Sequence, residues 1–241
     1  MMVGIGKAAQ KQILIKDASA LENMRKVNAL VIDKTGTLTI PNPNIDFTKA
    51  DNIPFEEREQ LKPNAAKAIV RLKEEGIDVF MMSGDKEAAV HYWAEKAGIE
   101  HYKSEVRPDD KQRLVSKLQQ EGKIAAMVGD GINDTQALAT ADVGIAIGRG
   151  TDVAMDVAQV TLMGNDLMAL PEAVNMSRRT VRMIWQNLFW AFIYNLVCIP
   201  LAAGALYLFG INFQITPMWA SALMAFSSVS VVLNSLRLKW L

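Results

Sequence analysis

Residues 33–39 place a carboxylate, a lysine, three hydroxyls and a glycine in the order Asp33-Lys34-Thr35-Gly36-Thr37-Leu38-Thr39. An aspartate carboxylate can attack phosphorus and form an acyl phosphate, which divides one difficult hydrolysis into two easier steps. Gly36 permits a sharp turn, and the hydroxyls of Thr35 and Thr37 can bond phosphate oxygens. Taken by itself, an aspartate in this position indicates an ordinary strand end followed by a turn.

Two further segments carry groups suited to a phosphoryl site. Ser83-Gly84-Asp85 offers a hydroxyl and a closely approaching backbone amide. Lys111 lies in the first turn of the helix that Pro108 is expected to open, where a cation opposes the helix dipole. A purely structural lysine is better placed near the other end of the helix, so Lys111 is a candidate for neutralising phosphoryl charge.

The segment Gly129-Asp130-Gly131-Ile132-Asn133-Asp134 concentrates oxygen ligands in a glycine-rich turn. Two carboxylates and an amide suit a hard Mg²⁺ ion that is bound through few protein oxygens. Asp-Gly and Asn-Asp are also common turn pairs. Together with residues 33–39, however, the segment favours a magnesium site.

Short apolar runs precede these groups and predict buried parallel strands. The runs are residues 29–32, 79–82, 124–128, 143–148 and 160–162, and helical patterns alternate with them. Polar groups at the carboxyl ends of parallel strands lie where open α/β sheets bind their ligands. The sequence therefore predicts an α/β fold with a doubly wound parallel sheet.

Composition limits the classes of function. Lys and Arg together number 26 and so do Asp and Glu, so no global positive charge attracts nucleic acid. The single cysteine, Cys198, excludes an internal disulfide and a cysteine-rich metal cage, and in its apolar run we expect it to pack. The first residues lack the pattern of a signal peptide.

The last third of the chain predicts a membrane hairpin. Asp166–Asn187 has the pattern of one long helix, and no charged residue occurs from Leu188 to Phe209, which is long enough to cross a bilayer. A second uncharged run, Met218–Leu236, is followed by Arg237 and Lys239. Basic residues thus flank the hairpin on one side only, which predicts that both of its ends are cytoplasmic.

Polar groups inside the predicted spans are candidates for a transport path. Tyr194 and Asn195 form a polar pair within the first span, and such groups need partners in lipid. Met224, Ser227 and Ser228 share one face of the second span. A methionine thioether is a soft ligand that suits Cu(I).

These motifs resemble those of the heavy-metal P-type ATPases, and in particular their copper-exporting group, within the haloacid-dehalogenase-like phosphotransferases. The resemblance covers nearly the whole chain, and it rests on Asp33–Thr39, Ser83–Asp85, Arg107–Lys111, Gly129–Asp134, Tyr194-Asn195 and Met224-x-x-Ser227-Ser228. Residues 6–16 also resemble the link that precedes the phosphorylation strand in that family.

The resemblance implies that ATP phosphorylates Asp33. It implies that Mg²⁺ is held by Asp33, the backbone carbonyl of Thr35 and Asp130, and that Asp134 supports this site. The other residues that it places around the phosphoryl group and cofactors are Lys34, Gly36, Thr37, Ser83, Gly84, Asp85, Lys111, Gly129, Gly131 and Asn133. It assigns the Cu(I) path to Tyr194, Asn195, Met224 and Ser228.

The resemblance also implies the domain organisation of an integral cell-membrane protein with a cytoplasmic phosphorylation domain. The expected parts are a link (1–28), the phosphorylation domain (29–165), a stalk helix (166–187) and the transmembrane hairpin (188–241). Residues 40–62 would be a much reduced nucleotide-domain insert, because only about 43 residues, none of them histidine, separate Thr39 from Ser83. The family's upstream spans and actuator domain are missing, so we expect these portions as partners and expect no transport by this chain alone.

Two other functions stay open at the level of sequence. One is a membrane-anchored phosphatase of the haloacid-dehalogenase type, and the other is a non-enzymatic module that docks on a full-length pump. Soluble relatives of the family usually carry a second aspartate two residues after the nucleophile, where it acts as acid and base. Thr35 occupies this position, which favours a persistent acyl phosphate over rapid hydrolysis.

Overall fold

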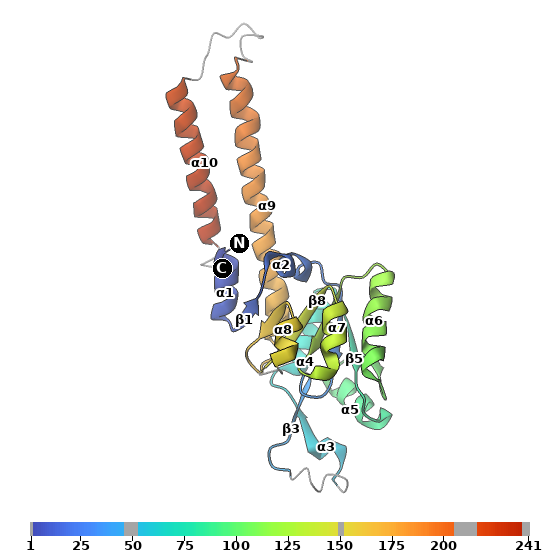
Figure 1. Ribbon diagram of the computed structural model, residues 1–241. Coiled ribbons are helices and arrows are strands. Elements are labelled where there is room, and N and C mark those ends of the chain that lie inside the picture. The colour runs from blue at the N-terminus through green and yellow to red at the C-terminus, as the bar shows by residue number, and fades with distance from the viewer. Residues whose placement is uncertain (1, 46–52, 149–151, 205–215, 238–241) are drawn as a thin grey trace. The chain divides into compact units, whose positions relative to one another are not determined.

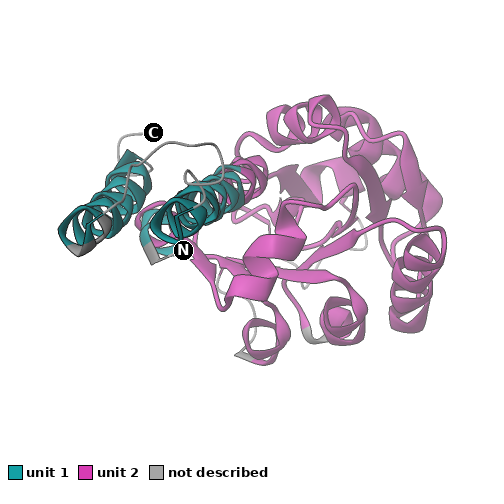
Figure 2. Ribbon diagram, turned by 90° about the horizontal axis from the view of Figure 1, so that it is seen from above, with its two compact units in different colours: residues 1–7, 179–241 teal, residues 8–178 magenta. Residues whose placement is uncertain are grey.

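The computed structural model describes residues 2–45, 53–148, 152–204 and 216–237 (Figure 1). The chain divides into two compact units, one of residues 8–178 and one that combines residues 1–7 with 179–241 (Figure 2). The domain bounds that the sequence suggested differ from this division and stay a prediction. Residues 205–215, which include the end of the predicted first span, and residues 238–241, including Lys239, lie outside the described residues.

The larger unit is built on a seven-stranded sheet in the order β1-β9-β8-β7-β2-β5-β6. Its strands are β1 (Ile13–Ile15), β2 (Ala29–Asp33), β5 (Asp78–Met82), β6 (His101–Lys103), β7 (Ala125–Gly129), β8 (Val143–Ile147) and β9 (Val160–Leu162). Every neighbouring pair is parallel except β1 with β9. The predicted parallel α/β sheet is therefore confirmed, with one antiparallel edge strand.

The centre of the sheet is β2, with β5 on one side and β7 on the other. The chain proceeds outward from β2 through β5 and β6, and then returns to β7, β8 and β9 on the opposite side. The carboxyl ends of β2 and β7 therefore flank the point where the strand order reverses, which is where open sheets form their ligand crevice. Asp33 pairs in register with Met82 of β5, and Ile32 pairs with Val128 of β7.

Helices connect the strands and supply the core. In the larger unit they are α2 (Ala18–Met24), α4 (Ala65–Glu74), α5 (Glu87–Ala97), α6 (Pro108–Gln120), α7 (Thr135–Thr140) and α8 (Asp152–Val157), with the 3₁₀ turn η2 at Ile132–Asp134. Val31 of β2 and Met127 of β7 belong to one buried cluster with Val115 of α6, Leu138 of α7 and Ala154 of α8. Because side chains alternate along a strand, this cluster covers one face of the sheet.

The short insert folds as a small ribbon with one helical turn. Strands β3 (Thr39–Pro41) and β4 (Glu59–Leu61) pair antiparallel, and α3 (Phe55–Arg58) precedes β4. The charged run Phe55–Leu61, whose sequence by itself predicts a helix, is helical only in its first half. Backbone pairing with β3 extends residues 59–61, and this tertiary contact overrides their helical propensity.

The smaller unit contains the helix α10 (Pro217–Arg237), residues 179–202 of the long helix α9 (Ala169–Ala202), and the start of α1 (Met2–Gln10). The predicted stalk helix begins at Ala169 instead of Asp166, and it continues without a break into the predicted first span. Pro200 lies within the last turn of α9. Within the part of the chain that the structure describes, α9 is the one helix long and apolar enough to cross a membrane.

Candidate phosphorylation site and membrane cavity

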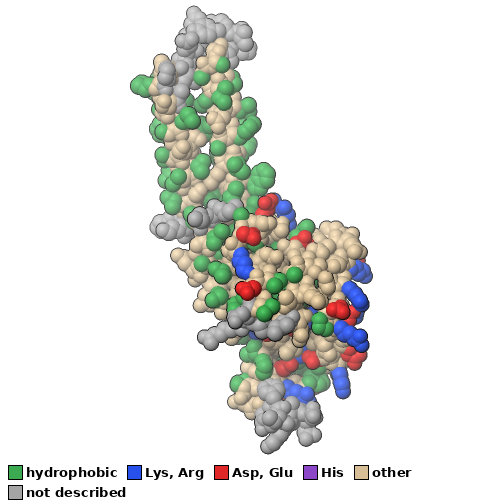
Figure 3. Space-filling view, in the orientation of Figure 1, with side chains coloured by type: hydrophobic (Ala, Val, Ile, Leu, Met, Phe, Trp, Pro, Cys, Tyr) green, Lys and Arg blue, Asp and Glu red, His purple; other side chains and the backbone are tan. Residues whose placement is uncertain are grey.

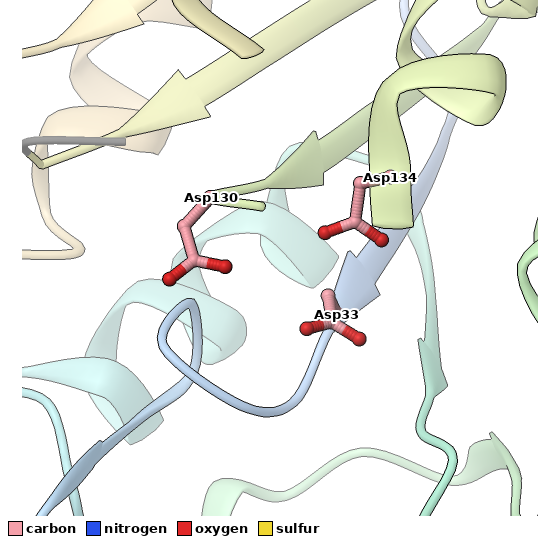
Figure 4. A group of neighbouring side chains, drawn as sticks. All are labelled: Asp33, Asp130 and Asp134. Atoms are coloured by element: carbon pink, nitrogen blue, oxygen red, sulfur yellow. The ribbon is translucent and has the colours of Figure 1, made fainter. Parts of the chain in front are cut away.

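Three aspartates lie together at the carboxyl edge of the sheet. Asp33 ends β2, Asp130 follows β7, and Asp134 ends η2. One carboxylate oxygen from each lies within 4.8 Å of the others, and Figure 4 shows the three side chains directed into one space. Asp33 and Asp134 are buried, and Asp130 is half-buried. An all-oxygen set of this kind is what Mg²⁺ prefers.

Lys111 joins two of these carboxylates. Its Nζ donates hydrogen bonds to Oδ1 of Asp33 at 2.5 Å and to Oδ1 of Asp134 at 2.7 Å. The first turn of α6 brings this lysine to the sheet edge, and the backbone N–H of Arg107 donates to Asp110 at the same helix start. The predicted conflict between Lys111 and the helix dipole is thus offset by two buried ion pairs.

The electrostatics of the site leave an excess of negative charge. Burial, supported by the nearby Asp134 carboxylate, raises the pKa of Asp33 to about 7 although Lys111 lowers it. Burial and Asp134 also raise the pKa of Asp130. Burial lowers the pKa of Lys111, but Asp33 and Asp134 together raise it above its ordinary value. A divalent cation would relieve this repulsion, so the residues fit Mg²⁺.

The loop after Asp33 packs closely under the carboxylates. An ideal Cβ on Gly36 would lie 1.8 Å from Oδ2 of Asp130, and one on Gly129 would lie 2.5 Å from Oδ2 of Asp134. Both glycines are therefore steric requirements of the site. The loop closes on itself, because the backbone N–H groups of Leu38 and Thr39 both donate to the carbonyl of Lys34.

The hydroxyl groups predicted to face phosphate differ in their surroundings. Thr37 is fully buried, and its Oγ1 has no hydrogen-bond partner among the described residues. A buried hydroxyl without a partner is uncommon in folded proteins. Thr35 is exposed on the loop, and Asn133 is exposed in the same turn as Gly131.

Ser83 and Asp85 belong to a second, adjoining group. The Ser83 hydroxyl donates to Oδ2 of Asp85 at 3.1 Å, and Lys34 contacts the same oxygen at 2.6 Å. Lys34 also contacts Oε2 of Glu59 at 2.5 Å, and Thr39 donates to that oxygen at 2.9 Å. Lys34 is therefore held by carboxylates of this second group, beside the three-aspartate cluster.

Two residues of the insert, Glu59 and Lys62, lie next to these groups, and the sequence analysis did not identify them. Glu59 pairs with Lys34, while Lys62 is buried next to the loop, where its backbone N–H donates to the carbonyl of Leu38. Burial lowers the pKa of Lys62, and the Asp130 carboxylate opposes this effect. Both side chains lie in a strongly charged segment, Phe55–Lys62, that resembles a solvated helix face. No local pattern distinguishes them from surface charges.

The smaller unit has a separate cavity between α9 and α10. Its volume is about 210 Å³, and it is lined by Tyr194, Asn195, Cys198, Leu223, Met224, Ser227 and Ser228. All four side chains predicted for the Cu(I) path thus lie around one space. Cys198, which the sequence analysis left as a packing residue, lies in the same wall and adds a second sulfur.

Polar side chains also connect the two helices away from this cavity. Asn187 Nδ2 donates to Oγ of Ser235 at 2.8 Å, and Asn234 Nδ2 donates to Oδ1 of Asn187 at 2.8 Å. By contrast, Asn195 Nδ2 donates to the carbonyl of Ala191 within its own helix. The network around Asn187 is therefore the interhelical polar contact that the sequence analysis did not identify.

Apolar side chains cover the outside of this helix pair. Large ones that are more than half exposed include Trp185, Leu188, Phe189, Trp190, Phe192, Leu196, Met218, Trp219, Met224 and Phe226. Figure 3 shows hydrophobic side chains along the visible face of these helices, and charged side chains on the visible face of the larger unit. An exposed apolar surface of this extent is typical of helices that contact lipid.

Comparisons with known proteins found one family model that matches the larger unit and relatives that match nearly the whole chain. A family model described as haloacid dehalogenase-like hydrolase matches residues 45–142. The chain is similar to a copper-exporting P-type ATPase of Legionella pneumophila subsp. pneumophila, with 36% identity over 341 residues that cover 99% of this chain and 46% of the relative. It is also similar to a copper-exporting P-type ATPase of Bacillus subtilis, with 50% identity over 240 residues that cover 98% of this chain and 29% of the relative.

A solved structure shows the same likeness in three dimensions. The crystal structure of a zinc-transporting PIB-type ATPase in its E2.Pi state superposes with a TM-score of 0.82 at 25% sequence identity, covering 98% of this chain and 54% of that one. The chain therefore spans about half the length, or less, of these relatives. The Legionella alignment extends over 341 residues against the 241 of this chain, so the relative has residues within the matched region that this chain lacks.

Proposed function

The chain belongs to the heavy-metal P-type ATPases, and on this premise we propose that it forms an aspartyl phosphate at Asp33 as the C-terminal portion of a copper(I)-exporting pump. One observation carries the proposal. Asp33 lies where the strand order reverses, Lys111 bonds its Oδ1 at 2.5 Å, and Asp130 and Asp134 lie around the same space. This arrangement combines a nucleophile, a fixed cation and an oxygen-ligand site.

The proposed reaction is a phosphoryl transfer in line with the Asp33 carboxylate. A carboxylate oxygen attacks the γ-phosphorus of ATP, the bond from that phosphorus to the bridging oxygen breaks, and this oxygen leaves with the electron pair on ADP. Lys111 fixes the plane of the carboxylate by holding Oδ1. We propose that the Thr37 hydroxyl, which has no hydrogen-bond partner among the described residues, donates to a phosphoryl oxygen.

The magnesium site would use this chain's own oxygens. Asp33, Asp130 and the backbone carbonyl of Thr35 are the proposed ligands, and Asp134 orients the site through Lys111. When bound, Mg²⁺ supplies positive charge to the phosphoryl group and keeps the Asp33 carboxylate ionised. Because Gly36 has no Cβ, the loop can approach Asp130, and both could then contribute oxygens to the ion.

The acyl phosphate should be long-lived because a general acid is lacking at the expected position. Thr35, two residues after the nucleophile, has a hydroxyl where hydrolytic relatives have a carboxyl. Without a group that activates water, the phosphorylated state persists and can drive a conformational change. The continuous helix α9 leads from the phosphorylation unit into the predicted membrane region.

We assign Cu(I) to the small cavity between α9 and α10 as the transported ion. Met224 and Cys198 offer soft sulfur ligands there, and Asn195 and Tyr194 offer polar atoms. The upstream spans of the relatives would complete this path. We therefore propose that the chain acts with those portions and with an actuator domain, in a cell membrane, and that it exports no copper alone.

Phosphorylation of the purified whole chain tests the proposal directly. We expect radiolabelled ATP or inorganic phosphate, with Mg²⁺, to give a hydroxylamine-labile label that Asp33→Asn abolishes. Asp78→Asn is the matched control, because Asp78 begins β5 at the opposite edge of the sheet. If the chain takes no label from either source, the proposal is contradicted, and the non-enzymatic docking module is the function that remains. Steady turnover of small phosphoesters without a stable label would instead indicate the phosphatase.

Copper binding needs its own measurement. Competition against a chromogenic Cu(I) chelator should show one bound ion in the whole chain in detergent, weakened by Met224→Leu. Met218→Leu is the control, because Met218 is exposed at the start of α10 and is not among the residues lining the cavity. Equal affinity in both variants would remove the copper assignment from this cavity.

A further inference from the structure

The smaller unit carries side-chain charge of one sign only. Its residues, 1–7 and 179–241, include basic side chains but no aspartate or glutamate, and the last acidic residue of the whole chain is Glu172. The basic residues of the unit are Lys7, Arg179, Arg182, Arg237 and Lys239. The positive charge of this unit therefore has no acidic side chain within the unit to pair with, and it attracts anions from outside.

The charges of α9 and α10 lie at one end of the helix pair. Between Arg182 and Arg237 the sequence contains no charged residue, so the end at which residues 203–216 connect the helices has no charge of either sign. The hydrogen bond from Asn187 to Ser235 fixes which residues of the two antiparallel helices lie side by side (Figure 1). It places Arg237 near the level of Trp185 along the helix axis, and Arg182 about one turn farther.

Arg182 begins a stripe of exposed side chains on one face of α9. Trp185, Gln186 and Phe189 follow it at spacings of three, four and seven residues, and such positions share one face of a helix. All four side chains are exposed, that of Trp185 by 60% and that of Phe189 by 58%. Along this stripe the groups change from a cation through an indole to a phenyl ring. A membrane surface has the matching order of charged headgroup, interfacial region and acyl chains.

The charge of Arg182 is not used inside the protein. Arg178, one turn earlier on the same face, donates from its guanidinium to Oε2 of Glu75 at 3.1 Å. The Arg182 side chain, by contrast, makes no ion pair or hydrogen bond with the residues that the structure describes. Its exposed guanidinium is therefore free to bind an external anion, and a guanidinium suits the oxygens of a phosphate group.

We propose that the stripe from Arg182 to Phe189 binds an anionic phospholipid in the leaflet at this end of the helix pair. The Arg182 guanidinium bonds the headgroup phosphate, the Trp185 indole lies in the interfacial region, and the acyl chains follow Phe189. One basic side chain near a membrane surface attracts anionic lipid by an amount that corresponds to about fivefold in affinity. The inference rests on the proposed membrane position of the helix pair and is independent of phosphorylation at Asp33.

Competition between two lipids tests this assignment. The whole chain in detergent is offered equimolar phosphatidylglycerol and phosphatidylcholine with the same acyl chains, and native mass spectrometry gives the ratio of the two bound lipids. We expect phosphatidylglycerol to predominate, and Arg182→Gln to lower the ratio about fivefold. Arg182→Lys should keep most of the ratio, because it keeps the charge. Arg113→Gln is the matched control, because Arg113 is 79% exposed on α6 and its ion pair is with Asp110 of the same helix.

Thermal unfolding in bicelles provides a second measurement. A lipid that binds only the folded chain stabilises it, so phosphatidylglycerol should raise the Tm of the unchanged protein and of Arg113→Gln. The increase should be smaller for Arg182→Gln. A Tm of Arg182→Gln that equals that of the unchanged protein in pure phosphatidylcholine shows that this variant folds normally.

Three results overturn the inference. A lipid ratio near one in the unchanged protein shows that the stripe does not select anionic lipid. An equal fall of the ratio in Arg113→Gln shows that net charge alone is responsible, and displacement of phosphatidylglycerol by inorganic phosphate shows a site for a free anion. All three leave the proposed membrane hairpin standing. A chain that does not float with phosphatidylcholine vesicles overturns the hairpin itself, and this inference with it.

Discussion

Gly36 and Asp130 approach each other so closely that a Cβ on Gly36 would lie 1.8 Å from Oδ2 of Asp130. The backbone of Gly36 is also left-handed, with φ of 74°. The loop after Asp33 therefore lies directly beneath the carboxylate that follows β7, as Figure 4 shows. Two segments almost 100 residues apart in sequence meet through this contact.

Gly36→Ala should abolish phosphorylation while the protein still folds. The methyl group would displace the Asp130 carboxylate, so we expect the label to fall at least about 100-fold, as for loss of a major electrostatic element. The left-handed backbone adds a stability cost of about 1–2 kcal/mol. Phosphoenzyme formation and urea unfolding measure the two effects.

Gly122→Ala separates the steric effect from the backbone effect. Gly122 has φ of 81°, and an added Cβ there meets nothing within 4 Å. This control should lose similar stability and keep its label. Normal labelling of Gly36→Ala would show that the contact with Asp130 is not required.

The stability of the magnesium-free protein should fall as pH rises toward 7 and level off above it. Burial raises the pKa of Asp33 from 3.8 to about 7, so between these values the folded state holds a proton that the unfolded state has lost. By linkage, stability then decreases with pH, at up to about 1.4 kcal/mol per pH unit for this single group. Asp33→Asn should flatten this part of the profile. Thermal unfolding in EDTA from pH 5 to 8 measures it, and parallel profiles for both proteins would contradict the assigned shift.

Thr35→Asp should convert a persistent acyl phosphate into a short-lived one. Thr35 is exposed on the loop, so an aspartate fits without displacing neighbours. A positioned carboxyl that activates water contributes about 10²–10⁴-fold. Decay of the label after a chase with unlabelled substrate measures the rate, with Thr35→Asn as the control that has the shape of aspartate but cannot act as an acid or base. An unchanged lifetime in Thr35→Asp would show that something other than the missing acid protects the acyl phosphate.

Asn187→Leu should loosen the helix pair. Asn187 bonds both Ser235 and Asn234 of α10, and interhelical hydrogen bonds of this kind contribute about 0.6 kcal/mol, at most about 1.7. We expect the free energy of unfolding of the whole chain, measured in bicelles, to fall by roughly 1–2 kcal/mol. Asn195→Leu is the control, because Asn195 bonds only Ala191 of its own helix among the hydrogen bonds described for it. Equal losses in both variants would argue against a specific role for Asn187.

Much of the candidate site could be predicted from the sequence, because its residues lie at the ends of strands that local patterns reveal. Asp33 ends one buried strand, Ser83 and Asp130 directly follow two others, and parallel strands place their carboxyl ends at one edge. Sequence alone therefore predicted the sheet and the aspartates that meet at its carboxyl edge. It also predicted the long apolar helix, because a bilayer demands a length of uncharged residues that can be counted.

Other contacts depend on which distant segments meet, and no local pattern encodes this. Lys34 faces Glu59 because β4 pairs with β3, and the same pairing turned the second half of an expected helix into a strand. Cys198 of α9 and Met224 of α10 line one cavity because these faces of the two helices are turned toward each other, and side-chain packing decides which faces those are.

The sequence by itself thus determined the chemical groups and the edge of the sheet to which they belong, because these follow from strand ends and motif order. The tertiary structure decided which charges pair, which glycines are sterically required and where the cavities lie. The physical reason is range: backbone conformation responds to neighbours along the chain, whereas burial, desolvation and steric exclusion depend on segments that only folding brings together.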